Sequence, residues 1–569
     1  MSPTTKSQKH LLTILVEDYF HVGAVENLIQ QRNWSNFEPR YEQNTIKALD
    51  LLDEYGTKAT FFVLGWIAEQ NPGLVRKIVA RGHEVASRGN YHRSYKNLTE
   101  EEFREDIKRT NIAIEDATGQ KVLGYRAAEK LAYADNDWML SVLADEGFAY
   151  DASFVPNIKN AKAKRFAHQH HANGKAIWEF PYSTIDLGLG LLPISGGNYF
   201  RQIPYTLMRQ AVRNWARRQN SPLVFYMHVW ELDPEQPRIS AASNYNRIRL
   251  YRKLDKMEWI LRENLRLYDC VGIAEYLGLK ESVQIQRSKI KDQIHEIKRF
   301  EISNPKSEIS IVIPCYNETD SLPYLANTLR SVEAGLNENG YQPNFIFVDD
   351  RSTDDTLAVL QKLFGDKRNV EILKHKTNLG VAAGIMTGIR AARIEIVCSM
   401  DCDCTYDPHE LLNMLPLMTE RIDMVTASPY HKDGGVRNVP GWRLFLSRGA
   451  SFLYRRVLRS KLGTYTSCFR VYRKSSIVGM ELDESGFLGV AEMLGRLDLN
   501  GGRIVEFPAV LDVRLFGLSK MKTARTILGH LKLLSSLIKM RWFRKSDAIK
   551  PSIPTEKLEI SFRKFDKIK

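Results

Sequence analysis

Two acidic motifs carry the clearest chemistry that this sequence offers. Asp349 and Asp350 follow the apolar run NFIFV, and Asp401 and Asp403 follow a second run, IVCS. Two carboxylates one residue apart on an extended segment face the same side, so we expect Asp401 and Asp403 to act together. Carboxylate oxygens are the ligands that Mg²⁺ and Mn²⁺ prefer. A cation held there could bridge a diphosphate and stabilise its charge as it leaves.

Cysteines alternate with the second pair of aspartates. Cys402 and Cys404 could instead form a thiolate site for Zn²⁺, but the same alternation turns them to the opposite face, so we favour the oxygen site. The spacing of the six cysteines does not indicate a disulfide framework in a chain of 569 residues.

The acidic motifs follow strands of a predicted α/β domain. From Glu308 onward, apolar runs such as EISIVIPCYN, NFIFVDD and IEIVCSMDCD alternate with helical patterns such as DSLPYLANTLRSVEAGL and VAAGIMTGIRAAR. This alternation favours a parallel sheet covered by helices. Ligands bind beyond the carboxyl ends of the strands in such a sheet, which is where the aspartates are expected.

An earlier part of the chain shows the same alternation. LLTILVED and KATFFVLG are predicted strands, and YEQNTIKALDLLDEYG is a predicted helix that ends at Gly56. The charged stretch from Lys280 to Lys306 has few apolar anchors and is interpreted as a linker. We therefore divide the chain into a first domain, 1–278, a linker, 279–307, a second domain, 308–519, and a basic C-terminal segment, 520–569.

Positive charge is concentrated toward the C-terminus. The net charge is +14, whereas residues 430–569 alone carry 28 Lys and Arg against 12 Asp and Glu. Residues 520–545 place Leu, Ile and Trp between Lys and Arg at helical spacing, which predicts a basic amphipathic helix. Such a charge indicates an anionic partner, which could be nucleic acid, a phospholipid surface or a phosphorylated substrate. No recognisable nucleic-acid-binding module is present, so we exclude nucleic acid and expect an anionic membrane surface.

Localisation follows from what the sequence lacks. The polar N-terminus MSPTTKSQKH does not resemble a secretory signal peptide. No window of about 18 residues is uniformly apolar, so no membrane span is expected. We expect a cytoplasmic protein that is peripheral at the inner face of the membrane.

The second domain resembles the family 2 glycosyltransferases with a GT-A (Rossmann-like) fold, especially the dolichol-phosphate mannosyltransferase-like branch. The matching motifs are IVIPCYNE, VDDRSTDDT, NLGVAAGIMTGI, MDCD and VRLFGLSKMKT. The resemblance implies a nucleotide-sugar donor and a divalent cation, Mg²⁺ or Mn²⁺. It also implies that Asp401 and Asp403 hold this cation. Nucleotide contacts are implied for Pro314, Tyr316, Glu318, Asp349 and Asp350.

Three further residues of this domain have two interpretations each. Glu492 lies where acidic residues of many such enzymes approach the acceptor, so it is either the general base or an ordinary helix-surface glutamate. Arg514 and Lys520 suit an acceptor phosphate, because guanidinium and ammonium groups pair with its charge. Their alternative is a solvated basic face.

The first domain resembles the polysaccharide deacetylases with NodB homology, in the branch linked to exopolysaccharide loci. The matching segments are ILVEDYFHV, GHEVASRGNYHR, GYRAAEK, EFPYSTI…LPISGGNYFRQIPY and HVWELDPEQPRI. The resemblance implies an irregular (β/α) barrel that removes acetyl groups from N-acetylated sugars. Carried over by position, Glu17 is the base, Asp18 and His92 are metal ligands, His228 is the acid and Arg126 contacts substrate.

This first domain departs from the family at its metal site. The family's second metal histidine stands in Ser-His-Gly, but this chain reads Ser87-Arg88-Gly89, and arginine cannot donate a lone pair to a metal. The family's Arg-x-Pro is also changed, to Arg126-Ala127-Ala128. Zn²⁺ or another divalent metal is therefore doubtful here. Either the domain is degenerate and recognises sugar, or it is active with a rearranged set of ligands.

Together these features predict an enzyme that moves a sugar from a nucleotide-diphosphate donor to a polyprenyl-phosphate or glycan acceptor. A deacetylase-like domain with an altered metal site is fused to it. The alternatives are an active bifunctional deacetylase and glycosyltransferase of exopolysaccharide biosynthesis, or a glycan-binding membrane scaffold.

Overall fold

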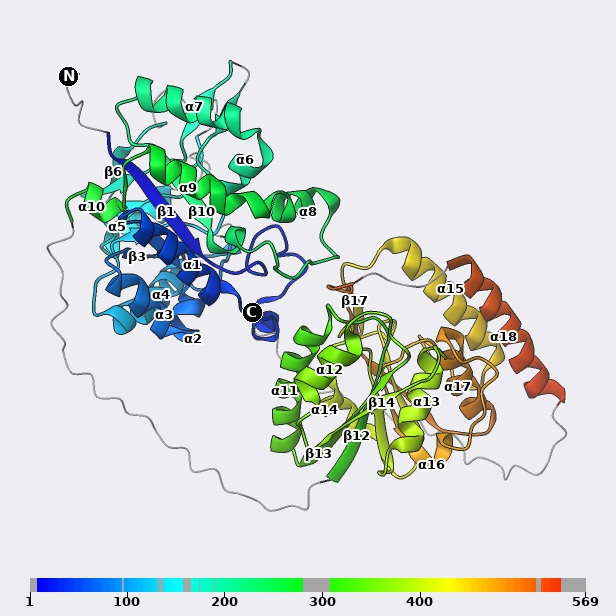
Figure 1. Cartoon of the computed structure of the whole chain (residues 1–569). Helices are drawn as coiled ribbons and strands as arrows, with labels where there is room; N and C mark the ends of the chain where they lie inside the picture. Colours follow the sequence, from blue (N-terminus) through cyan, green and yellow to red (C-terminus); the bar gives the residue numbers. More distant parts are fainter. Residues whose placement is uncertain are drawn as a thin grey trace.

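The chain forms two α/β domains, one built by the N-terminal half and one by the C-terminal half (Figure 1). The predicted α/β fold class is therefore confirmed. The predicted linker, 279–307, lies outside the described residues except at its two end residues. Lys520 also lies outside them. The computed structural model describes residues 8–94, 97–129, 131, 137–156, 165–172, 174–188, 190–279, 307–517 and 523–543.

The first domain is organised around a nine-stranded sheet that curls into an irregular half-barrel. The strand order is β10-β1-β2-β3-β4-β5-β7-β6, with β11 paired to β1, and every pair is parallel except β6 with β7. The strands are β1 (His10–Val16), β2 (Thr60–Val63), β3 (Glu84–Ser87), β4 (Gly124–Tyr125), β5 (Tyr150–Asp151), β6 (His168–Ala172), β7 (Lys175–Glu179), β10 (Val224–His228) and β11 (Cys270–Val271), and a separate hairpin joins β8 (Thr184–Asp186) to β9 (Leu191–Pro193).

Helices connect these strands and bury one face against the sheet. The longest begins with a capping box between Thr99 and Glu102 and ends at Gly119, whose φ of 69° suits glycine. The elements are η1 (Gln31–Asn36), α1 (Tyr41–Glu54), α2 (Gly65–Gln70), α3 (Pro72–Ala80), α4 (Glu100–Thr118), α5 (Asp137–Asp145), α6 (Gly197–Gln202), α7 (Tyr205–Arg218), η5 (Val229–Leu232), α8 (Asn244–Tyr251), η6 (Leu254–Lys256), α9 (Met257–Leu267) and α10 (Ile273–Tyr276).

The second domain contains a seven-stranded mixed sheet in the order β14-β13-β12-β15-β18-β16-β19. β12 and β13 pair in parallel over nine residues, and β18 runs antiparallel to both of its neighbours. The strands are β12 (Ser307–Cys315), β13 (Tyr341–Asp349), β14 (Val370–Lys374), β15 (Ile396–Ser399), β16 (Met424–Ser428), β18 (Arg470–Arg473) and β19 (Ile504–Pro508), beside the short pair β17 (Gly435–Val436) and β20 (Val510–Leu511).

Helices pack on both faces of this sheet, which explains the two separate apolar clusters on either side of it. The described part of the basic C-terminal segment forms helix α18. This helix packs against α15 (Figure 1). The elements are α11 (Leu322–Glu338), α12 (Thr356–Phe364), α13 (Val381–Ala391), η7 (Pro408–Glu410), α14 (Leu411–Met414), η8 (Leu415–Leu417), α15 (Gly441–Val457), α16 (Lys474–Ile477), α17 (Phe487–Leu499) and α18 (Thr523–Phe543).

One apolar cluster crosses from the first domain to the second. Its first-domain members include Phe37, from the loop after η1, and its second-domain members include Tyr324 and Phe516. The Phe37 and Tyr324 ring centroids are 5.0 Å apart. We call this set the shared aromatic cluster. Through this cluster, the loop that contains Phe37 packs against Tyr324 of helix α11 and against Phe516, two residues after Arg514.

Candidate active sites at the ends of two sheets

A pocket of about 230 Å³ lies at the carboxyl ends of β12, β13 and β15. Its position is the one expected for a ligand site in an open α/β sheet. Most of its polar lining consists of carboxylates, together with one arginine. The lining residues are Pro314, Cys315, Tyr316, Glu318, Asp350, Asn378, Gly380, Val381, Asp401, Cys402, Asp403 and Arg514.

Asp350 shapes one wall of this pocket. Its carboxylate accepts hydrogen bonds from the amides of Leu379 (2.8 Å) and Gly380 (2.7 Å), directly before helix α13. Gly380 has a φ of 97°, and a Cβ there would lie 2.7 Å from the Cα of Gly486, so only glycine fits this turn. Asp349, predicted alongside it, is fully buried, is not among the lining residues and accepts from the Ser352 amide (3.2 Å).

Asp401 and Asp403 both line the pocket, as the alternation predicted, although the local structure differs from the expectation. Strand β15 ends at Ser399, so the motif lies in a turn and not on an extended segment. Cys402 points into the core, where its Sγ lies 3.7 Å from that of Cys315. Burial and the neighbouring Asp403 carboxylate raise the pKa of Asp401 to about 7. The pocket therefore concentrates negative charge that a cation would relieve.

Arg514 places one positive charge beside these carboxylates. Its guanidinium pairs with Glu318, and its Nε lies 3.6 Å from Asp403 Oδ2. Burial lowers the pKa of Arg514, but Asp403 and Glu318 outweigh this effect and raise it above its ordinary value. Arg514 thus stays charged beside the acidic motif.

Glu492 does not line this pocket. Its buried carboxylate accepts from the amides of Asp483 (3.0 Å) and Glu484 (2.8 Å) and from Arg496 (2.6 Å). These contacts fix the loop that leads to Gly486 and hence to the turn at Gly380. Neither the general-base interpretation nor the helix-surface interpretation describes this arrangement, which is that of a buried positioning residue.

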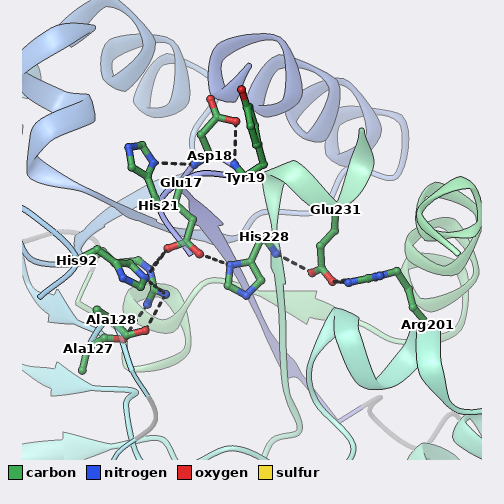
Figure 2. A network of polar contacts seen from close by, with 11 residues as sticks. Glu17, Asp18, Tyr19, His21, His92, Ala127, Ala128, Arg201, His228 and Glu231 are labelled. Carbon is green, nitrogen blue, oxygen red and sulfur yellow. Dashed lines mark hydrogen bonds and ion pairs between the residues drawn. The ribbon is translucent and has the colours of Figure 1, made fainter. Parts of the chain in front are cut away.

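In the first domain, Glu17 is the centre of a buried polar network at the end of β1 (Figure 2). Its two carboxylate oxygens lie 2.7 Å from Arg88 Nε and 2.5 Å from His228 Nδ1, and His92 Nε2 is 3.3 Å away. Burial alone would raise the pKa of Glu17, but Arg88, His228 and His92 outweigh it and hold the pKa well below its usual range.

Arg88 is fixed within this network. It follows strand β3 and also donates to the carbonyl oxygens of Ala127 (2.8 Å) and Ala128 (3.4 Å), which replace the family's x-Pro. Its Nη2 lies 3.5 Å from His92 Nε2. The cation that Glu17 and its neighbours require is therefore provided by the chain itself.

Asp18 points away from Glu17 and toward backbone amides (Figure 2). Its carboxylate accepts from the amides of Tyr19 (3.0 Å), Arg40 (2.6 Å) and Tyr41 (2.9 Å), and burial raises its pKa to about 7. Among the described residues of either domain, no group of three or more His, Cys, Asp or Glu side chains is placed to hold a metal ion. Asp18 is thus held by backbone amides and His92 lies beside Glu17 and Arg88, and their predicted role as metal ligands stays a prediction.

Arg126 lies inside the barrel, where it is fully buried. It donates to the carbonyl oxygen of Ala152 (2.7 Å) and to the Thr13 hydroxyl (2.8 Å), and its guanidinium lies 4.8 Å from the Phe62 ring centroid. Burial lowers its pKa. These contacts are those of a core residue and give no support to the predicted substrate contact.

An ion pair that supports His228 was not predicted from the sequence. Glu231 accepts from the His228 amide (3.0 Å) and is held by a fully buried ion pair with Arg201 (2.8 Å) (Figure 2). The spacing of His228 and Glu231 is that of a capping box, which is the one local signal available. Arg201 comes from helix α6, and no local sequence pattern indicates that it pairs with Glu231.

The mixed sheet and the carboxylate-lined pocket define the second domain as a nucleotide-sugar-binding domain of GT-A fold, and the curled parallel sheet defines a deacetylase-type barrel before it. Family models match accordingly: "Glycosyl transferase family 2" over residues 310–478 and "Polysaccharide deacetylase" over 29–147. A "Domain of unknown function (DUF3473)" matches residues 154–277.

Curated relatives match the second domain. The "Polyprenol monophosphomannose synthase" of Mycolicibacterium smegmatis is 30% identical over 225 residues, which cover 38% of this chain and 82% of the relative. The "Dolichol-phosphate mannosyltransferase" of Pyrococcus furiosus is 29% identical over 244 residues, 42% of this chain and 66% of the relative. A crystal structure of a CE4 family pseudoenzyme from Bacillus anthracis is 18% identical over 48% of this chain and 66% of that chain, with a TM-score of 0.27.

The chain belongs to glycosyl transferase family 2, and a polysaccharide deacetylase domain precedes its transferase domain. Both resemblances and the predicted fold class are thereby confirmed.

Arg88 provides a stability test of the first site. Arg88→Ala removes the cation beside buried Glu17 and should lower the free energy of unfolding of this domain by about 3–5 kcal/mol. Arg81→Ala, which breaks exposed pairs with Asp50 and Asp53, is the matched control and should cost under about 1 kcal/mol. Urea unfolding of both variants measures this, and equal effects would contradict the described role of Arg88.

Proposed function

We propose that the chain transfers a sugar from a nucleotide-diphosphate donor to a polyprenyl-phosphate acceptor at the inner face of the membrane. The observation that carries this proposal is the convergence of Asp350, Asp401 and Asp403 with Arg514 on one pocket at the strand ends. The names of the two curated relatives, which both describe synthesis on a polyprenyl-type phosphate, support the choice of acceptor.

A divalent cation, Mg²⁺ or Mn²⁺, fits the second site. Asp401 and Asp403 would hold it, since both line the pocket and the Asp403 carboxylate is close enough to raise the pKa of Asp401, after burial as the larger cause. Such cations keep several waters and take further ligands from substrate phosphates, so two carboxylates suffice on the protein side. When bound, the cation would neutralise charge on the donor diphosphate.

The chain's own residues would bind and orient the phosphates. Gly380 and Val381 line the pocket at the start of helix α13, where the helix dipole favours an anion, and Asp350 fixes that turn. Arg514 would pair with a phosphate of donor or acceptor through its guanidinium. Lys520, predicted for the same task, lies outside the described residues.

Asp403→Ala should abolish sugar transfer, because one of the two proposed ligands of the cation is lost. Activity is measured with labelled nucleotide sugars, Mg²⁺ or Mn²⁺, and polyprenyl phosphate. We expect a loss of at least about a hundredfold, comparable to removal of a key electrostatic group. The control is Asp366→Ala, an exposed carboxylate of the same domain, which should leave transfer unchanged. Full activity of Asp403→Ala would refute the metal assignment.

For the first domain, the proposal is recognition of a glycan without metal-dependent hydrolysis. The buried guanidinium of Arg88 already neutralises Glu17, and Asp18 is engaged by three backbone amides. Joining such a domain to the transferase raises the effective concentration of its ligand near the second site.

Metal content and acetate release test this interpretation. We expect the purified protein to retain no stoichiometric Zn²⁺ and to release no acetate from N-acetylhexosamine oligomers. Elemental analysis and an acetate assay measure the two quantities. Stoichiometric Zn²⁺, with turnover that is lost in Asp18→Ala, would instead establish an active deacetylase with rearranged ligands.

Membrane attachment is proposed through helices α15 and α18. Trp442, Phe445 and Phe452 on α15 and Leu528 and Trp542 on α18 are exposed apolar side chains. Arginines and lysines alternate with them, which suits the interface of an anionic leaflet. Within the described residues, no helix combines the length and apolar composition needed to cross a membrane. The exposed basic residues are Arg443, Arg448, Arg455, Arg456, Lys532, Lys539 and Arg541.

Flotation with liposomes tests this attachment. The protein should float with vesicles that contain anionic lipid and much less with neutral vesicles, because each basic residue near the surface adds about 1 kcal/mol. Phe445→Glu combined with Trp542→Glu should reduce flotation. Trp259→Glu, at an exposed tryptophan of the first domain, is the matched control. Equal flotation of all three proteins would count against α15 and α18.

A further inference from the structure

The loop that contains Arg514 is held by the first domain. Arg514 Nε donates to the carbonyl oxygen of Phe516 (2.8 Å), which folds the loop back on itself. The carbonyl oxygen of the intervening residue, Leu515, accepts from the amide of Ser240 in the first domain (2.8 Å). The backbone beside Arg514 is thus fixed by a hydrogen bond across the domain boundary.

Aromatic packing holds the same loop from another side. The Phe516 ring centroid lies 6.0 Å from that of Phe37 and 5.9 Å from that of Tyr324. Phe37 and Phe516 are 2% and 5% exposed, so the first domain excludes water from this contact. Buried aromatic contacts of this kind specify one geometry because a shifted ring loses its packing.

Both first-domain contacts come from segments that begin at the Glu17 network. Phe37 precedes Arg40, whose amide donates to Asp18 and whose side chain pairs with Asp233 (2.5 Å). Ser240 lies on the loop that follows β10, which ends at His228, and η5. The residues that fix the Arg514 loop are therefore continuous with those that form the first polar site.

We propose that the deacetylase-like domain is a positioning domain for Arg514, with Phe37 and Ser240 as the positioning residues. They hold the guanidinium against Glu318 and Asp403, where it meets a phosphate of the substrate. This inference rests on the proposed function of the second pocket, and it adds that transfer requires the first domain's loops in the same chain.

A released loop should have two effects of opposite direction. Arg514 lies 3.6 Å from Asp403 and competes there with a divalent cation, so its release should tighten cation binding. Transfer should slow, because the guanidinium no longer meets the phosphate in the required geometry. General destabilisation of the pocket would instead weaken both.

The test compares full-length Phe37→Ala with Arg32→Ala. Arg32 makes an exposed ion pair with Asp407 across the same boundary, 3.8 Å long, and is not a member of the shared aromatic cluster. For Phe37→Ala we expect sugar transfer to fall about tenfold or more, while the affinity for Mn²⁺ alone, followed by electron paramagnetic resonance, rises. Arg32→Ala should match the wild type in both. Unchanged transfer in Phe37→Ala, or transfer lost together with Mn²⁺ binding, would overturn the proposal.

A measurement without ligands separates this inference from the proposed function. Amide hydrogen exchange over 512–517 should accelerate in Phe37→Ala but not in Arg32→Ala, and unchanged exchange overturns the positioning role. If Phe37→Ala does not fold, Phe37→Leu keeps an apolar side chain without the ring contact and is judged by the same criteria. A wild-type protein that binds no Mn²⁺ would refute the metal assignment, while the exchange result still decides the role of the first domain.

Discussion

A carboxylate buried away from water requires a cation or a set of donors, and this requirement organises both sites of the protein. Glu17 in the first domain is paired with Arg88, which is itself buried and held by two carbonyl oxygens. In the second domain, the half-buried carboxylates of Asp403 and Glu318 lie beside Arg514 in the wall of the pocket. The same physical need is therefore met permanently in the first domain. In the second domain this need is met by Arg514, whose carboxylate partners Glu318 and Asp403 also line the ligand pocket.

This difference explains why we assign chemistry to one site and recognition to the other. A guanidinium has no lone pair for a metal and cannot act as a Lewis acid, so the role proposed for the first site is recognition. The second pocket is lined by four carboxylates, those of Glu318, Asp350, Asp401 and Asp403, and by one arginine, Arg514. Exposed apolar and basic side chains on α15 and α18 are the features on which the proposed membrane attachment of this domain rests.

The sequence allowed the strand ends to be predicted well and the directions of individual side chains less well. Apolar runs located β12, β13 and β15, so the acidic motifs were expected at one sheet edge, where they lie. The pattern could not show that Asp349 is absent from the pocket lining, or that Asp18 turns toward the amides of Arg40 and Tyr41, which are distant from it in sequence. Arg126 and Glu492 were given roles by position within a family, and tertiary packing buries both. The Arg201–Glu231 pair joins two elements 30 residues apart and had no periodicity to indicate it.

The shared aromatic cluster has a consequence for how such a chain can change over evolutionary time. Family boundaries divide the protein between residues 277 and 310, but Phe37, Tyr324 and Phe516 form a single packing unit. A mutation that removes hydrolytic chemistry from the first domain leaves this unit intact, whereas loss of the domain would expose its rings to water. Natural selection can thus preserve the first domain for its packing against the second, independently of any hydrolytic activity of its own.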